Sequence, residues 1–176
     1  MRKLTILFLT CFLSSCGSVP ITTMFKLSKF DNSDIAEIRA NELRVRLTLD
    51  DPIKLAKQSL RLQLKFEYSN ASKEAFEFQL EPTRKLKEIS SSGWFNAKEL
   101  RRSYEFKLTR VAQLEFSNFQ KTLMDKHKVK KYFWTVFYFL APHDKSDAKV
   151  DVELKLANNQ EYFYLLKAAK VKITND

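Results

Sequence analysis

Few side chains in this chain of 176 residues are of types that carry out chemistry, and the most reactive ones lie near its start. Both cysteines, Cys11 and Cys16, fall within the segment "LTILFLTCFLSSCGSVP", residues 4–20. A cysteine thiolate is a strong nucleophile and can take up an alkyl group as a thioether. The role of each thiol depends on the segment in which it stands.

The first fifteen residues have the composition of an export signal. Arg2 and Lys3 form a positive start, residues 4–13 form an apolar run, and small residues follow at 14–18. A run of this length is too short to span the hydrocarbon core of a bilayer, which takes roughly 20 apolar residues in a helix. The sequence therefore predicts a cleaved signal peptide over residues 1–15.

The segment Leu13-Ser14-Ser15-Cys16 resembles the lipobox of bacterial lipoproteins, an aliphatic residue and two small residues before a cysteine. The resemblance covers residues 1 to about 18. It implies a diacylglyceryl group on the Cys16 sulfur, cleavage before Cys16 and an N-acyl chain on the new amino terminus. Because Gly17 stands where an Asp commonly retains such proteins in the inner membrane, the resemblance implies the periplasmic face of the outer membrane. The outer leaflet of the inner membrane is the alternative.

Two other interpretations of the start remain open: an ordinary secretory signal that leaves a spare thiol, and a cytosolic chain with an apolar start. On the lipoprotein interpretation Cys11 is removed and Cys16 is acylated, so no disulfide forms. Residues 16–23 then form a lipidated tether, and residues 24–176 form a single globular domain, which is long enough to bury its own core.

The rest of the chain lacks the combinations that catalysis or metal binding requires. His127 and His143 are separated by a predicted strand and form a poor metal pair. There is no G-x-S-x-G motif, and Asp50-Asp51 stand before Pro52 in a predicted turn, where carboxylates are usually capping or solvated groups. We therefore expect no catalytic residues, no metal and no cofactor beyond the lipid on Cys16, and a protein that is not an enzyme.

The chain is strongly basic, with a formal net charge of +10. An exported protein meets anionic lipid headgroups and cell-wall carboxylates, so we expect no nucleic-acid partner. The densest positive cluster, "KHKVKK", ends the predicted helix, and its candidate contacts with an anionic surface are Lys126, Lys128, Lys130 and Lys131. The alternative is that the helix dipole favours these cations at its carboxyl end.

Alternation of apolar and polar residues dominates the middle and the end of the chain. It appears in "LRVRLTL" (43–49), "LRLQLKFEY" (60–68), "FEFQLEP" (76–82), "YEFKL" (104–108) and "VDVELKL" (150–156). A period of two with one polar face is typical of antiparallel strands packed on one side. Asn70-Ala71-Ser72 and Asn158-Asn159 fit turns, and "EYFYLLKAAKVKI" predicts a final strand bent at Ala168-Ala169.

Other segments follow different patterns. Residues 110–126 have apolar residues at helical spacing, with Thr109 as a cap, and residues 35–40 follow a capping-box spacing between Asp34 and Glu37. Residues 132–141 are apolar on both faces, which predicts a strand between two layers.

Residues 81–102 lack either period and predict a loop with a short helical turn. Trp94 and Phe95 in that loop, with Trp134 in the aromatic strand, are the candidate aromatic contacts for a ligand or a partner.

These observations predict a mainly β (α+β) fold: an antiparallel sheet or β-sandwich of about seven strands with one amphipathic helix packed on it. The function they favour is a membrane-anchored, non-enzymatic envelope accessory that binds the bilayer through Cys16 and an envelope protein partner. The alternative is a carrier of a lipid or hydrophobic ligand in a cavity lined by Phe133, Trp134, Phe137 and Phe139. An apolar cavity of about 300 Å³ or more favours the carrier.

Overall fold

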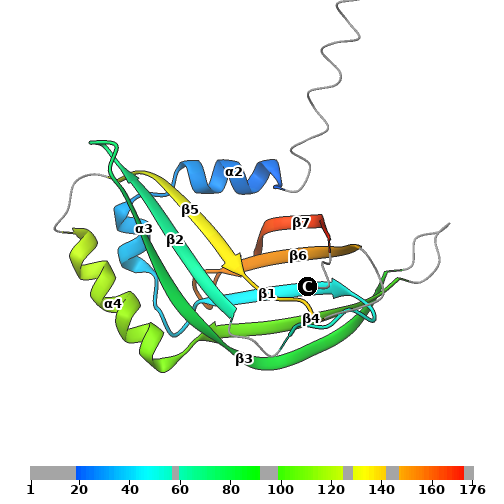
Figure 1. Ribbon diagram of the computed structural model, residues 1–176. Helices are drawn as coiled ribbons and strands as arrows, with labels where there is room; N and C mark the ends of the chain where they lie inside the picture. The colour runs from blue at the N-terminus through cyan, green and yellow to red at the C-terminus, as the bar shows by residue number, and fades with distance from the viewer. Residues whose placement is uncertain (1–18, 57–59, 92–98, 125–128, 142–146, 173–176) are drawn as a thin grey trace, which may run out of the picture.

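The computed structural model describes residues 19–56, 60–91, 99–124, 129–141 and 147–172 (Figure 1). Its helices are α2 (Ile21–Ser28), α3 (Asn32–Glu37) and α4 (Arg110–Met124). Its strands are β1 (Arg44–Asp50), β2 (Leu60–Tyr68), β3 (Lys73–Ser91), β4 (Glu99–Leu108), β5 (Val129–Phe137), β6 (Asp147–Lys155) and β7 (Phe163–Lys172).

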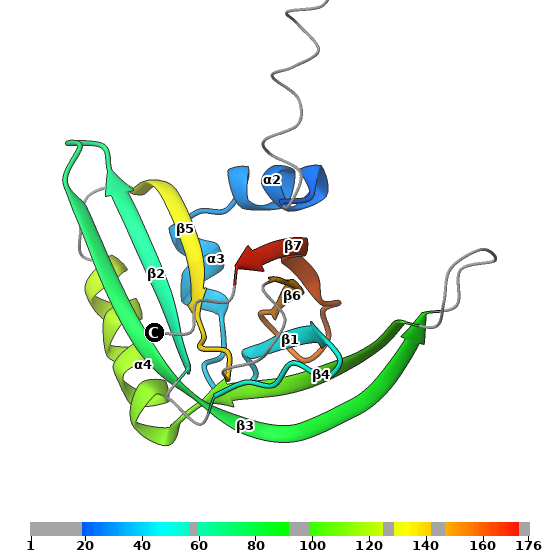
Figure 2. The same ribbon diagram turned by 45° about the vertical axis from the view of Figure 1, so that its right-hand side comes forward.

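All seven strands form one antiparallel sheet in the order β5-β2-β3-β4-β1-β6-β7. The sheet bends so strongly along β3 and β4 that it nearly closes on itself, as the turned view shows (Figure 2). The predicted mainly β fold with seven antiparallel strands is therefore confirmed. The alternative of a β-sandwich is not confirmed, because the described strands belong to a single continuous sheet.

Alternation of side chains explains why these segments pair as they do. In the β1–β4 ladder Val45 lies opposite Phe106, and in the β1–β6 ladder Val45 lies opposite Leu154. All three side chains are buried on the inner face of the sheet, while the arginines and acids between them lie on the outer face. A shift of one residue would exchange the two faces, so the hydrophobic pattern fixes the register.

Helix α4 begins where it was predicted and carries aromatic side chains onto β2 and β3. The Thr109 hydroxyl accepts a hydrogen bond from the backbone N–H of Ala112 at 3.2 Å and caps the first turn. The ring of Phe119 stacks on Phe66 of β2, with 5.2 Å between centroids, and Phe116 meets Phe78 of β3 edge to face at 5.1 Å. These rings, together with Phe76, form a connected aromatic cluster between α4 and the sheet.

The two turns predicted between strands are present, with one change of detail. In the β2–β3 turn the positive φ, 65°, falls on Ala71, while Asn70 uses its side chain to accept the backbone N–H of Ser72 at 3.0 Å. The bend predicted in the last strand lies at Ala168, whose φ is 49°, where the β6–β7 register shifts.

Three predictions about local structure were wrong. Residues 81–102 were expected to be a loop, but β3 continues to Ser91 and β4 starts at Glu99, because the two strands pair over that whole length. The capping box uses Asp31 and Asp34, so α3 starts three residues earlier than the expected spacing. β5 was expected between two layers, but it is an edge strand whose Phe133 is exposed.

We predict that Phe119→Ala destabilises the fold by about 3–5 kcal/mol, because it empties space between α4, β2 and β3. Leu114→Ala on the exposed side of the same helix is the matched control, with an expected change within about 0.5 kcal/mol. Urea unfolding followed by circular dichroism measures both variants. Equal midpoints for the two variants would contradict the aromatic contact as a source of stability.

Candidate functional site

The most distinctive feature of the fold is the seam where the sheet fails to close. β5 and β7 are the two ends of the strand order, and α2 lies over the gap between them (Figures 1 and 2). The Thr23 hydroxyl of α2 donates a hydrogen bond to the carbonyl oxygen of Tyr164 in β7. The Lys26 ammonium lies 4.3 Å from the centre of the Phe163 ring on the same strand. One side of the seam is thus tied to α2.

The segment after α2 secures the other side of the seam to β5. Phe30 packs edge to face against Tyr132, at 5.7 Å between centroids, and against Trp134, at 6.3 Å. The Tyr132 hydroxyl bonds to the side-chain oxygen of Asn32. Burial raises the pKa of Tyr132, and the nearby carboxylates Asp31 and Asp34 add to the increase. Tyr132 therefore remains a neutral hydrogen-bond donor at physiological pH.

Between α2 and the strands lies an apolar groove of about 340 Å³, which we call the seam groove. Its walls come from Val19 just before α2, from α2 (Thr23 and Leu27), from β5 (Tyr132, Phe133, Trp134, Thr135 and Val136) and from β6 and β7 (Val152, Leu165 and Leu166). Trp134 is only 8% exposed, and its indole Nε1 has no hydrogen-bond acceptor among the described residues. A buried donor without an acceptor is unusual in a folded protein.

The outer side of α2 is apolar as well. Ile21, Met24 and Phe25 are 71%, 60% and 66% exposed, and their spacing of three and four residues places them on one side of the helix. Only Thr23 of the eight residues in α2 is buried. This helix therefore shows more apolar surface to the outside than it buries against the sheet.

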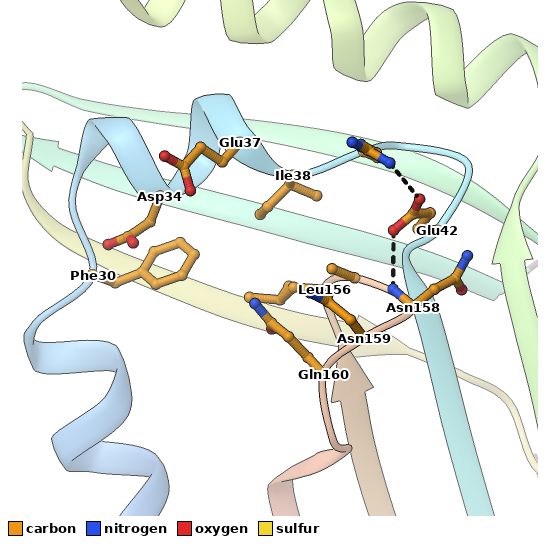
Figure 3. A pocket seen from close by; sticks show the side chains of 11 residues that line it. Phe30, Asp34, Glu37, Ile38, Glu42, Leu156, Asn158, Asn159 and Gln160 are labelled. Carbon is orange, nitrogen blue, oxygen red and sulfur yellow. Dashed lines mark hydrogen bonds and ion pairs between the residues drawn. The ribbon is translucent and has the colours of Figure 1, made fainter.

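A second, polar groove of about 470 Å³ lies between α3 and the turn that joins β6 to β7 (Figure 3). Its charged lining comprises Asp34, Glu37, Arg39 and Glu42, and its apolar floor includes Phe30 and Leu156. Glu42 accepts the backbone N–H of Asn158 at 2.9 Å and an N–H of Arg39 at 3.2 Å, as the dashed lines show (Figure 3).

Two carboxylates of this polar groove, those of Glu42 and Asp34, accept hydrogen bonds from the backbone and so stabilise the local structure. The hydrogen bond from the backbone N–H of Asn158 is the main cause of the lowered pKa of Glu42. The same hydrogen bond fastens the β6–β7 turn to the segment just before β1. Asp34 accepts the backbone N–H of Asp31 at 2.8 Å as part of the capping box. The polar groove is therefore explained by the local structure that surrounds it.

The outer face of the sheet carries a partly buried polar network centred on Arg101. The Arg101 guanidinium donates to Asp50 of β1 at 2.9 Å and to Asp151 of β6, and Asp151 accepts the backbone N–H of Ala168 in β7. Farther along, the Tyr162 hydroxyl donates to Glu105 at 2.7 Å. These charges and hydroxyl groups connect strands to one another, which is a structural role.

Most of the candidate site residues lie outside the described residues: Cys16, Trp94, Phe95, Lys126 and Lys128. Lys130 and Lys131 are exposed on β5, and Trp134 lines the seam groove. The structure thus places one predicted aromatic residue at the site and two predicted lysines on the strand that forms its edge.

The lining expected for a carrier needs correction. Phe133 and Trp134 do line the seam groove, but Phe137 and Phe139 do not. Phe139 lies beyond the end of β5 and is exposed. The groove instead uses residues of α2, β6 and β7, which sequence analysis could not bring together.

Sequence analysis also missed the outward face of α2, although its signal was present. Ile21, Met24 and Phe25 have helical spacing within "ITTMFKLS". Of the apolar residues in this segment and just after it, only Leu27 and Phe30 pack against the core.

No helix among the described residues is long and apolar enough to span a membrane. Within the same residues no group of three or more histidine, cysteine or acidic side chains is arranged to hold a metal ion. Comparison of the chain with known protein families, with curated proteins and with solved structures found no match. The function must therefore be argued from the geometry alone.

We predict that Arg101→Met destabilises the protein by about 2–3 kcal/mol, because it leaves the partly buried carboxylates of Asp50 and Asp151 without their cation. Arg61→Met is the matched control: it breaks the ion pair with Glu77, 2.7 Å long and on the surface, and should cost less than about 1 kcal/mol. Thermal unfolding of both variants measures the difference. A loss for Arg101→Met no larger than for Arg61→Met would show that the network does not hold the strands.

Proposed function

We propose that this protein is a bacterial lipoprotein that serves as a non-enzymatic accessory of the cell envelope and lies with α2 against the bilayer. Cys16 carries the diacylglyceryl group and the N-acyl chain. The observation that carries the proposal is the exposed apolar face of α2, formed by Ile21, Met24 and Phe25. This face begins five residues after the acylated cysteine, where a domain tied to the membrane surface must lie.

The free energy of membrane binding through acyl chains supports the placement of α2 against the bilayer. A single acyl chain gives only marginal membrane binding, and each buried CH₂ contributes about 0.8 kcal/mol, so two or three chains attach the protein permanently. An apolar helix face held next to such an anchor gains free energy by entering the interface. In solution the same face would remain in contact with water, at a cost that its surroundings do not offset.

Positive charge near the same end of the molecule adds a weaker attraction. β5 begins at the end of the molecule on which α2 lies, in both views (Figures 1 and 2). Lys130 and Lys131, the second and third residues of this strand, are exposed. A lysine close to an anionic surface contributes about 1 kcal/mol. We propose that these lysines contact lipid headgroups. This is the part of the predicted cluster for which the structure gives exposure.

We further propose that the acylated domain resides on the periplasmic face of the outer membrane, since Gly17 follows Cys16. Its role is to bind an envelope protein partner. The network around Arg101 supports a non-enzymatic role, because its guanidinium, Asp50 and Asp151 are engaged with one another between strands.

The attachment is tested on the protein as the cell produces it. We expect mass spectrometry of its N-terminal peptide to show a chain that begins at Cys16, with a diacylglyceryl thioether and an amide-linked acyl chain. Cys16→Ser should abolish both the cleavage and the lipid, whereas Cys11→Ser should leave them unchanged. An unmodified Cys16, or a peptide that still contains residues 1–15, refutes the lipoprotein assignment.

The orientation is tested with an environment-sensitive label. In a Cys11→Ser background, Met24→Cys labelled with nitrobenzoxadiazole should shift its emission to the blue when the acylated protein is reconstituted into vesicles of phosphatidylethanolamine and phosphatidylglycerol. Leu114→Cys on α4 is the matched control, since Leu114 is as exposed as Met24, and its label should not shift. Equal emission from the two labels would show that α2 does not face the bilayer.

A further inference from the structure

We propose that the seam groove takes up one acyl chain of a bilayer lipid, whose ester carbonyl oxygen accepts a hydrogen bond from Trp134 Nε1. This inference deepens the proposed function and rests on it, because the lipid comes from the bilayer against which α2 lies. It gives the carrier alternative a specific site and a specific ligand chemistry.

The lining of the groove matches a hydrocarbon chain. Leu27, Val136 and Leu166 come from three different elements and provide aliphatic surface around a volume of about 340 Å³. This lies at the lower end of the range of about 300–1,000 Å³ that is usual for ligand sites. The hollow persists because β5 and β7 are not paired across the seam, so their side chains cannot close on one another as they do elsewhere in the sheet.

The mouth of the groove points to the bilayer as the source of that chain. Val19 and Phe133 both line the groove and are both exposed, at 39% and 48%. Val19 stands two residues before Ile21, the first residue of the outward face of α2. Exposed apolar side chains therefore lie both at the mouth of the groove and, two residues further along the chain, on the face proposed to contact the bilayer.

The weak attachment of α2 allows it to act as a lid. The helix buries only Thr23, and its link to β7 consists of the Thr23 hydrogen bond and the contact of Lys26 with Phe163. Elements with few buried apolar contacts open at low free-energy cost. Displacement of α2 also moves the attached Phe30 away from Trp134, against which it packs edge to face.

The buried indole supplies the polar part of the site. While α2 is in place, Trp134 Nε1 is shielded from water and has no acceptor among the described residues. A buried donor without an acceptor lowers the stability of the folded state, and an apolar side chain of similar shape would not carry this cost. A lipid ester at the head of an acyl chain provides the missing acceptor when the lid is raised.

The test uses the acylated protein with Trp94→Phe, which makes Trp134 the single tryptophan. We expect its fluorescence to be strongly quenched in vesicles whose phospholipids carry bromine at the middle of their acyl chains, relative to unbrominated vesicles. A buried indole outside the bilayer meets mid-chain bromine only if a lipid chain leaves the hydrocarbon core. The chains on Cys16 carry no bromine, so the signal reports bilayer lipid alone.

Val136→Phe and Leu166→Phe fill the groove from opposite sides, and each should reduce the quenching several-fold. Val111→Phe adds the same ring on the exposed side of α4 and should leave the quenching unchanged. With ¹⁵N-labelled indole in bicelles, the Trp134 Nε1 proton should resonate downfield of its position in Val136→Phe. Absence of quenching, or equal quenching in the two groove variants and the control, overturns the proposal.

The outcome is separable from that of the proposed function. A shifted label at position 24 without quenching of Trp134 leaves α2 on the bilayer and refutes the lipid site. Quenching that depends on Val136, together with an unshifted label at position 24, supports the groove and refutes the proposed orientation of α2.

Discussion

The whole molecule depends on a sheet that curves without closing. A seven-stranded antiparallel sheet with β5 at one end and β7 at the other presents two rows of backbone groups without strand partners at the seam. Exposed strand edges invite pairing with other chains, and proteins usually cover or charge them. Here α2 covers the seam, β7 carries lysines along its length, and Phe30 joins the covering segment to the core of the sheet.

The curvature itself is maintained by opposite chemistry on the two faces. Inside, stacked rings such as Phe66 and Phe119 bring α4 onto β2 and β3. Outside, Arg101 draws Asp50 and Asp151 together across β1, β4 and β6. Burial raises the pKa of Glu153 even though Arg46 lies 3.5 Å away and opposes the shift. The outer face is thus desolvated enough for its ion pairs to matter.

Sequence analysis located most strands and the long helix because their periods are local properties. β2 matches its predicted range, and α4 starts at Arg110 as predicted. The extension of β3 to Ser91 escaped it, since residues 84–91 become a strand through pairing with β4, a partner that no local period reveals. Sequence analysis also missed the edge position of β5. Two apolar faces predict apolar surroundings, but the local pattern does not tell whether a second layer of the protein or a lipid surface provides them.

The candidate site was the hardest part to predict, because it combines residues from four elements. Of the three aromatic residues proposed as contacts, only Trp134 lies among the described residues. Leu27 and Leu166, which line the groove together with Trp134, lie more than a hundred residues from each other in the chain. Helical spacing in residues 21–28 indicates an apolar face but leaves open whether that face points inward or outward. Only the sheet decides this, because the inner positions at the seam go to Thr23 and Leu27, and Ile21, Met24 and Phe25 are left outside. One short helix therefore has an apolar groove beneath it and an apolar face above it, so a ligand that reaches the groove and a surface that receives the helix must both be apolar.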